Sequence, residues 1–191
     1  MRQSDLAVQH KHVIAATRHW LDTVVIALNL CPFAKPRFVQ NTIQYSYTDA
    51  AGEASLLEAL ADELIKLDTN PDISTTLLIH PKVLSNFSDY NQFLELAEQL
   101  LEMSGYRGVY QVVGFHPQFQ FTETDQDDVG NYTNRSPYPM LHILREAEVT
   151  AAVEQYPNVE EIPSQNIKTL KQCGVKKLHK LLLESSESRS H

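Results

Sequence analysis

Residues 114–146 read GFHPQFQFTETDQDDVGNYTNRSPYPMLHILRE, and the interpretation of the whole chain depends on this stretch. It opens on an apolar strand, breaks at His116-Pro117 and crosses a long polar connection before apolar residues return. A connection without obvious secondary structure, here about residues 122–134, is unusual in a compact domain and indicates either function or disorder. Because aromatic residues and prolines bracket the connection on both sides, we expect an ordered loop with a function.

The chain before this stretch alternates between helical and strand patterns. Apolar residues spaced by three and four predict helices, and β-branched or alternating runs predict strands. The expected helices are 13–30, 53–68 and 89–104, and the expected strands are 43–47, 73–79 and 109–115. Because strand–helix–strand units favour parallel pairing, we expect an α/β fold with a small, mostly parallel sheet of three or more strands and helices on both faces.

The chain after the loop is expected to be helical. Ser136 can cap a helix that has Pro137 at its first position and runs to about Gln155. A shorter helix is expected over 164–170, and KKLHKLLL at 176–183 predicts an amphipathic one.

A single domain is expected over residues 12–174. Residues 1–11 are polar and expected to be loose, and residues 175–191 form a second terminal extension. Its end, SSESRSH, is too polar to pack, so we expect the last residues to be disordered.

The composition excludes some classes of partner. Of 191 residues, 42% are hydrophobic and 21% charged, and the formal net charge is −8. No basic stripe is present to neutralise phosphates, which argues against nucleic acid as the partner. No apolar run approaches a membrane span, and the N-terminus lacks a signal-peptide core, so we expect a cytoplasmic protein without a membrane partner. Cys31 and Cys173 lie far apart in the sequence and form no CxxC pair, so we expect two reduced thiols.

Two of the predicted strands end in His-Pro, at His80-Pro81 and at His116-Pro117. Proline restricts the preceding residue to extended conformations, so each histidine keeps strand geometry as the chain turns away. If the strands are parallel, both imidazoles emerge at the same carboxyl edge, where open α/β sheets usually bind ligands. The alternative is that His-Pro is simply a polar way to end a strand.

On the predicted helix after the loop, His142 and Glu146 lie one turn apart. This spacing suits one metal ion, one acid–base pair or only an exposed polar pair. Arg135 precedes the helix cap, where a guanidinium beside backbone N–H groups makes an anion site. Alternatively, Arg135 pairs with acidic residues of the loop.

Cys31-Pro32-Phe33-Ala34 invites comparison with the CPFC motif of glutaredoxins, but Ala34 replaces the resolving cysteine. Cys31 is expected to end a helix, where the helix dipole raises the pKa of a thiol. We therefore interpret Cys31 as a buried structural thiol near the irregular connector expected over residues 31–40, with a metal ligand or nucleophile as the alternative.

Four motifs together carry a resemblance to a known family. CPFA after an apolar helix, GFHPQFQF, NRSPYP and LHILRE resemble the uncharacterised bacterial family catalogued as domain of unknown function 1415, over roughly residues 12–174. The resemblance implies a bacterial-type, single-domain, cytoplasmic protein. It transfers no catalytic role to any residue.

These patterns predict an enzyme that acts on a small anionic molecule at the carboxyl edge of the sheet. His116 is expected to be the general base, with His142 and Glu146 beside it, and these three would be the ligands of a divalent metal if one is bound. The expected substrate-binding residues are Arg135, Asn134, Arg145 and His80. The alternatives are a non-catalytic module that binds a ligand or metal in the same pocket, and an interaction protein that docks through its basic amphipathic tail.

Overall fold

The computed structural model describes residues 3–187, with the side chains of residues 6–186. Its sheet has four strands in the order β1-β2-β4-β3. They are β1 (Ile43–Tyr47), β2 (Thr75–Ile79), β3 (Tyr110–Phe115) and β4 (Met140–Arg145). β1 and β2 pair in parallel, whereas β4 runs antiparallel to both β2 and β3.

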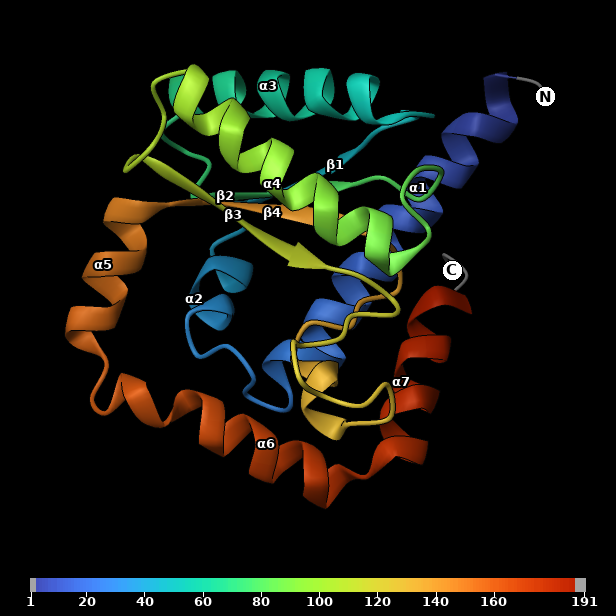
Figure 1. Ribbon diagram of the computed structural model, residues 1–191, viewed down its shortest axis with the longest axis vertical. Helices are drawn as coiled ribbons and strands as arrows, with labels where there is room; N and C mark the ends of the chain where they lie inside the picture. Colours follow the sequence, from blue (N-terminus) through green and yellow to red (C-terminus); the bar gives the residue numbers. More distant parts are fainter. Residues whose placement is uncertain (1–2, 188–191) are drawn as a thin grey trace.

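Helices cover both faces of this sheet (Figure 1). α3 (Glu53–Thr69) and α4 (Phe87–Met103) pack on one face, called here the α4 face. On the other, called the α1 face, lies α1 (Gln3–Trp20), which continues into the π-helical turn η1 (Leu21–Ile26). The remaining helices on that side are α2 (Ala34–Val39), α5 (Glu146–Gln155), α6 (Ile162–Cys173) and α7 (Val175–Glu187), with short 3-10 turns η2 (Val129–Thr133) and η3 (Val159–Glu161).

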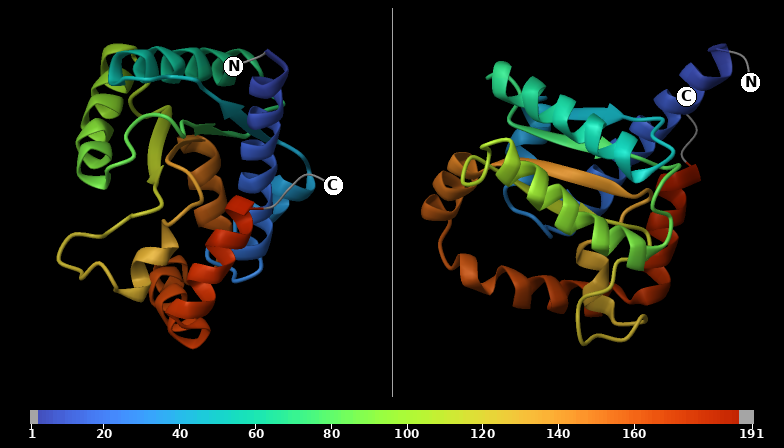
Figure 2. Two further views of the ribbon diagram at one scale, coloured as in Figure 1. Left: turned by 90° about the vertical axis from the view of Figure 1, so that its right-hand side faces the viewer. Right: turned by 45° about the horizontal axis from the view of Figure 1, so that its top comes forward.

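Each face has its own apolar core. On the α4 face, Leu60 and Leu64 of α3 and Phe93 of α4 are fully buried against Leu141 and Ile143 of β4. The core of the α1 face is formed mainly by α1, η1, α6 and α7. Figure 2 shows the C-terminal helices, in red, near the loop that follows β3, in yellow. Among the described residues, no helix is long and apolar enough to span a membrane.

The segment 140–145 corrects the predicted helix over 136–155. Only α5, from Glu146, is helical, and Met140–Arg145 is the strand that lies between β2 and β3. Ser136 and Tyr138 both precede a proline, and such residues favour extended backbone over helix. The apolar run MLHIL then fits a central strand, because such a strand is covered on both faces.

The fold class is α/β, but the expectation of a mostly parallel sheet is wrong. β1 and β2 form the one parallel pair, and both pairings of β4 are antiparallel. β2 and β3 still point the same way, since each runs antiparallel to the strand between them. Their carboxyl ends therefore reach the same sheet edge. There His80 donates its backbone N–H to Pro139, and His116 donates its own to Asn134.

Most element boundaries before residue 116 agree with the prediction within a few residues, and the two termini differ from it. The first helix begins at Gln3, so the expectation of a loose segment over 1–11 is wrong from that residue onward. In the tail, Ser185 is fully buried, and its hydroxyl donates to the carbonyl of Leu181, one turn earlier in α7. α7 runs to Glu187, so the disorder expected for SSESRSH is wrong over residues 185–187, and residues 188–191 lie outside the described residues.

The close approach of α4 to β3 depends on a glycine. A Cβ at Gly114 would lie 2.7 Å from the hydroxyl oxygen of Tyr90. That hydroxyl donates a 2.8 Å hydrogen bond to the carbonyl of Met140 and so ties α4 to the first residue of β4. A side chain at position 114 would force these elements apart.

Candidate functional site

His80 and His116 lie close together on the α4 face, as their shared strand edge predicted. Both are fully buried. The ring of Tyr90 stacks on His80 at 5.9 Å between centroids and lies 5.0 Å from the ring of His116. Phe87, also from α4, covers His116 at 5.5 Å. The two histidines therefore belong to an aromatic cluster under the start of α4 and do not line an open pocket.

Both ring nitrogens of His116 are occupied. Nδ1 accepts the backbone N–H of Gln118 at 3.0 Å, and Nε2 donates to the carbonyl of Leu84 at 3.1 Å. Because one partner can only donate and the other can only accept, the ring is neutral and carries its proton on Nε2. Burial also lowers its pKa. This geometry leaves no nitrogen free to act as a general base or to bind a metal.

His80 is held by one hydrogen bond, from Nδ1 to the carbonyl of Val83 at 3.1 Å. Its Nε2 is buried and has no partner among the described residues. Burial lowers the pKa of His80 to about 4, and the neighbouring His116 contributes in the same direction. His80 is therefore neutral at physiological pH and is not exposed to a ligand.

His142 lies on the other side of the sheet. It is a middle residue of β4, opposite Leu77 of β2 and Val113 of β3. Its neighbours Leu141 and Ile143 face α3 and α4, so alternation turns His142 to the α1 face. There its Nε2 lies 2.7 Å from the hydroxyl of Thr75, which donates to the carbonyl of Ile143 and so accepts from the ring.

The predicted His116–His142–Glu146 site is therefore not assembled. The sheet separates the two rings, and Glu146 begins α5 and does not lie one helical turn beyond His142. Among the described residues, no group of three His, Cys, Asp or Glu side chains is arranged to hold a metal ion. The structure thus gives no support to a divalent metal at these residues.

Two of the expected substrate-binding residues stabilise the fold. Arg145 donates from Nε to the carbonyl of Ile73 at 3.1 Å and from Nη2 to the carbonyls of Leu67 and Asn70, at the C-terminus of α3. A cation at the C-terminus of a helix also interacts favourably with the helix dipole. Asn134 donates from Nδ2 to the carbonyl of Gly114 at 3.0 Å and so holds the end of the loop against β3.

The long loop is ordered by a buried asparagine that the sequence did not single out. Asn131 is fully buried, and its Oδ1 accepts the N–H of Phe121 and the hydroxyl of Thr124, both at 3.0 Å. Its Nδ2 donates to the carbonyl of Asp125 at 2.9 Å. The side chain of Asn131 thus makes three hydrogen bonds to groups of the loop that would otherwise bond to water.

Arg135 is fixed on the inner side of this loop. Its Nε donates to the carbonyl of Phe119 at 3.2 Å, and its Nη2 donates to the carbonyl of Gln126 at 2.6 Å. The guanidinium lies over the ring of Tyr132, 4.6 Å from its centroid. These contacts hold Arg135 in one orientation and use only part of its five N–H donors.

Arg135 lines a pocket of about 420 Å³ between the loop and the start of α7, called here the basic pocket. Its lining residues are Pro117, Gln118, Gln126, Asp127, Tyr132, Arg135, Val175, Lys176 and His179. Sequence reasoning found Arg135 but missed Lys176 and His179, because they lie in the segment taken as a terminal extension. The available signal was the run of basic residues in KKLHKLLL.

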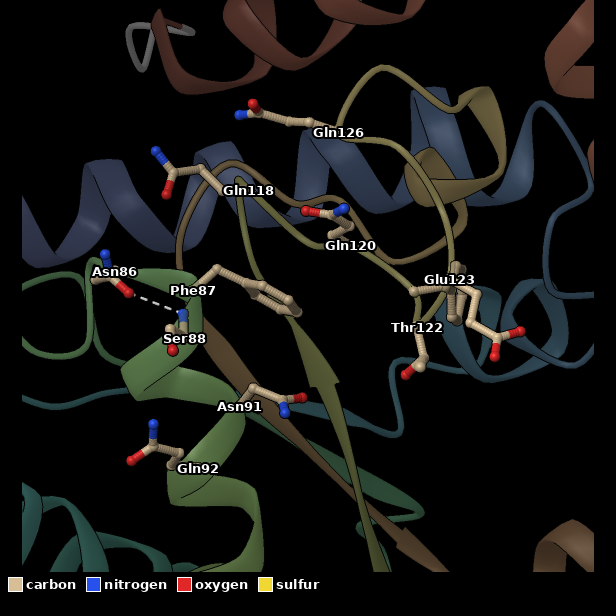
Figure 3. A pocket seen from close by; sticks show the side chains of 11 residues that line it. Asn86, Phe87, Ser88, Asn91, Gln92, Gln118, Gln120, Thr122, Glu123 and Gln126 are labelled. Atoms are coloured by element: carbon tan, nitrogen blue, oxygen red, sulfur yellow. Dashed lines mark hydrogen bonds between the residues drawn. The ribbon is translucent and has the colours of Figure 1, made fainter.

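A second pocket, of about 630 Å³, lies between the same loop and the N-terminal end of α4 and is called here the amide pocket (Figure 3). Its lining residues are Asn86, Phe87, Ser88, Asn91, Gln92, Gln118, Gln120, Phe121, Thr122, Glu123 and Gln126. Gln118 and Gln126 line both pockets. The two hollows therefore adjoin along one loop.

Cys31 precedes α2, so the CPFA motif starts a helix. The backbone N–H groups of Phe33 and Ala34 are hydrogen-bonded to its thiol and lower the thiol pKa, but burial is the larger effect and leaves the pKa raised. The pKa of the Cys31 thiol is thus raised, as expected, but the cause is burial and not the dipole of the preceding helix. Cys31 and Cys173 are both free and pack partly buried in the core of the α1 face.

Comparison with known proteins gives one match. The model of a family described as "Protein of unknown function (DUF1415)" matches residues 12–180. No curated protein and no solved structure matches the chain. The matched range ends inside α7 and includes both Lys176 and His179.

Replacing His116 is expected to lower the free energy of unfolding of the protein. His116→Ala removes a buried ring and leaves the carbonyl of Leu84 and the N–H of Gln118 without their partners, which should cost about 2–4 kcal/mol in the free energy of unfolding. His179→Ala, at an exposed position of α7, should change it by less than about 0.5 kcal/mol. Urea denaturation of both variants measures this; equal stabilities would contradict a structural role for His116.

Stability should fall in mild acid because of His80. Its folded-state pKa is about 4, while the unfolded chain has the ordinary value near 6.5, so protons bind preferentially to the unfolded chain. The contribution of neutral His80 to the free energy of unfolding is fully present above pH 6.5 and is lost as the pH falls towards 4. At pH 5 the free energy of unfolding is lower by about 2 kcal/mol. His80→Asn removes the titrating group and keeps an amide that can donate to Val83. Its unfolding free energy should therefore decline less than that of the wild type between pH 7 and pH 5, and parallel declines would contradict this.

Proposed function

The chain belongs to the DUF1415 family of proteins of unknown function, and we propose that it binds a small anionic molecule in the basic pocket. Its place of action is proposed to be the cytoplasm, where the two free cysteines remain reduced. The observation that carries the proposal is the convergence of Arg135, Lys176 and His179 from two separate elements on one hollow.

Arg135 is the central residue of this proposal. Its hydrogen bonds to Phe119 and Gln126 and the ring of Tyr132 fix the plane of the guanidinium. A guanidinium held in this way loses little side-chain entropy when it binds an anion and can present paired N–H donors to a carboxylate or phosphate. It supplies the fixed charge of the pocket, and Lys176 supplies a mobile one.

The start of α7 adds donors of its own. Gly174, with φ +79°, ends α6 in a conformation that side chains rarely adopt, and α7 begins at the next residue. The first N–H groups of a helix have no acceptor within it and carry partial positive charge. Val175 and Lys176 lie in this first turn and both line the pocket, so the backbone and side-chain charges act in the same direction.

Asp127 is the single carboxylate among the lining residues. It opposes an anion electrostatically but can accept a hydrogen bond from a hydroxyl of the ligand. A ligand that carries both a negative group and hydroxyl groups satisfies every charged residue in the pocket. A bare hydrophobic acid does not.

The structure supports binding of a ligand in the basic pocket better than it supports catalysis by His116 and His142. The expected general base, His116, has both ring nitrogens engaged and is fully buried. His142, its expected partner, faces the opposite side of the sheet. A ligand in the basic pocket instead meets the ionisable side chains of Asp127, Tyr132, Lys176 and His179, and any proton transfer there would use one of these groups.

Inorganic phosphate is the simplest probe of this pocket. Isothermal titration at low ionic strength should show saturable binding that weakens as salt is added, since the interaction is electrostatic. Lys176→Gln removes a charge from the lining and should weaken binding about fivefold, which corresponds to about 1 kcal/mol. His179→Gln removes the second basic side chain that α7 contributes to the lining and should also weaken binding.

Lys177 provides the matched control. It is exposed and adjacent to Lys176 on the same helix, but it does not line the pocket. Lys177→Gln changes the net charge by the same amount and should leave phosphate affinity within about twofold of the wild type. Equal losses in Lys176→Gln and Lys177→Gln would show general charge attraction and contradict a site.

A further inference from the structure

We propose that the amide pocket binds a neutral, hydroxyl-rich ring, so that the ligand of this protein is a sugar that carries an anionic group. The sugar ring occupies the amide pocket and its anionic group the basic pocket; this assignment rests on the proposed function of the basic pocket. It names the class of ligand, which the basic pocket alone leaves open.

The lining of the amide pocket is rich in side-chain amides. Six of its residues carry one, three from the start of α4 and three from the loop (Figure 3): Asn86, Asn91, Gln92, Gln118, Gln120 and Gln126. Each amide presents donors and an acceptor side by side, and a sugar hydroxyl also donates and accepts. Ser88 and Thr122 add hydroxyl groups of the same dual character.

Much of this hydrogen-bonding capacity is not used by the fold. The side chains of Asn91, Gln92 and Gln118 form no hydrogen bond within the part of the chain that the structure describes. Two others are engaged: Asn86 caps α4 by accepting the N–H groups of Ser88 and Asp89, and Gln120 donates to the carbonyl of Thr124. The pocket therefore has a fixed rim and several amides that remain available to a ligand.

A rigid aromatic surface lies among these amides. The ring of Phe87 is 5.1 Å from Phe119 and 5.5 Å from His116, and it belongs to the buried cluster around Tyr90. Phe121 packs edge-on against Phe119 at 4.9 Å and is 41% exposed. An aromatic face fixed from behind can stack on the C–H face of a sugar ring at little cost in entropy.

Charge decides which part of the ligand lies in which pocket. Glu123 is the single charged residue on the lining of the amide pocket, and no Lys, Arg or His lines it. An anionic group would be repelled there, whereas Arg135 and Lys176 attract it to the basic pocket. Glu123 can accept hydrogen bonds from two hydroxyl groups of a neutral ring.

The two pockets are joined by Gln126 as well as by Gln118. Arg135 donates through Nη2 to the backbone carbonyl of Gln126 at 2.6 Å. The residue that would bind the anion therefore also holds the backbone of the residue that would contact the sugar. One ligand that spans both pockets would be bound at a fixed relative position of its two parts.

Isothermal titration with inorganic phosphate and a panel of sugar phosphates tests this proposal. The panel contains the 6-phosphates of glucose, galactose, mannose and fructose, and ribose 5-phosphate. At least one of them should bind tenfold or more tightly than inorganic phosphate, because the sugar adds hydrogen bonds in the amide pocket. The double variant Asn91→Ala/Gln92→Ala should reduce that affinity to the value for phosphate and leave phosphate binding unchanged.

Gln99→Ala is the matched control, since Gln99 is an exposed amide on the same helix outside the pocket; it should bind the sugar phosphate as the wild type does. The inference is overturned if no member of the panel reaches a tenfold gain, or if the gain survives in the double variant. In either case, phosphate binding that still depends on Lys176 leaves the proposed function standing. Absence of phosphate binding in the wild type refutes the proposed function itself.

Discussion

The insertion of β4 between β2 and β3 determines the rest of this structure. β4 pairs with β3 along its whole length and with β2 from Met140 to Leu144, so it connects two strands that point the same way and would otherwise be expected to pair. Because β3 and β4 are antiparallel, the connection between them leaves and re-enters the sheet at one edge. That edge is where His80 and His116 lie, and the loop over residues 116–139 has to pack against it.

This arrangement separates the residues that sequence reasoning had grouped. Apart from α2 and the start of α1, the strands and helices before residue 116 follow clear periodicity and were predicted closely, because local patterns decide them. The segment 136–155 was misread because Ser136 and Pro137 suit the start of a helix, while two residues before prolines favour an extended chain. Once Met140–Arg145 is a strand, alternation places His142 on the face opposite to His116.

Of the residues that line the candidate site, the sequence predicted Arg135. The reason for that prediction was wrong. Arg135 was expected beside the first turn of a helix that begins at Ser136, and the structure places it beside the first turn of α7, 40 residues further along the chain. Such a contact cannot be read from local sequence, because it depends on how α6 and α7 fold back on the loop. Lys176 and His179 were missed for the same reason. The buried histidines have a structural role. Each is neutral and forms a hydrogen bond on the face of the sheet where it lies.

The account therefore places the ligand in the two pockets along the loop, between α4 and α7, and assigns the histidines at the sheet to stability. Backbone amide chemical shifts of ¹⁵N-labelled protein, followed as inorganic phosphate is added, test this most directly. The largest saturable changes should occur at Arg135, Val175 and Lys176, with none at Val113 or His142. Changes centred on Val113 and His142, with the start of α7 unaffected, would contradict it.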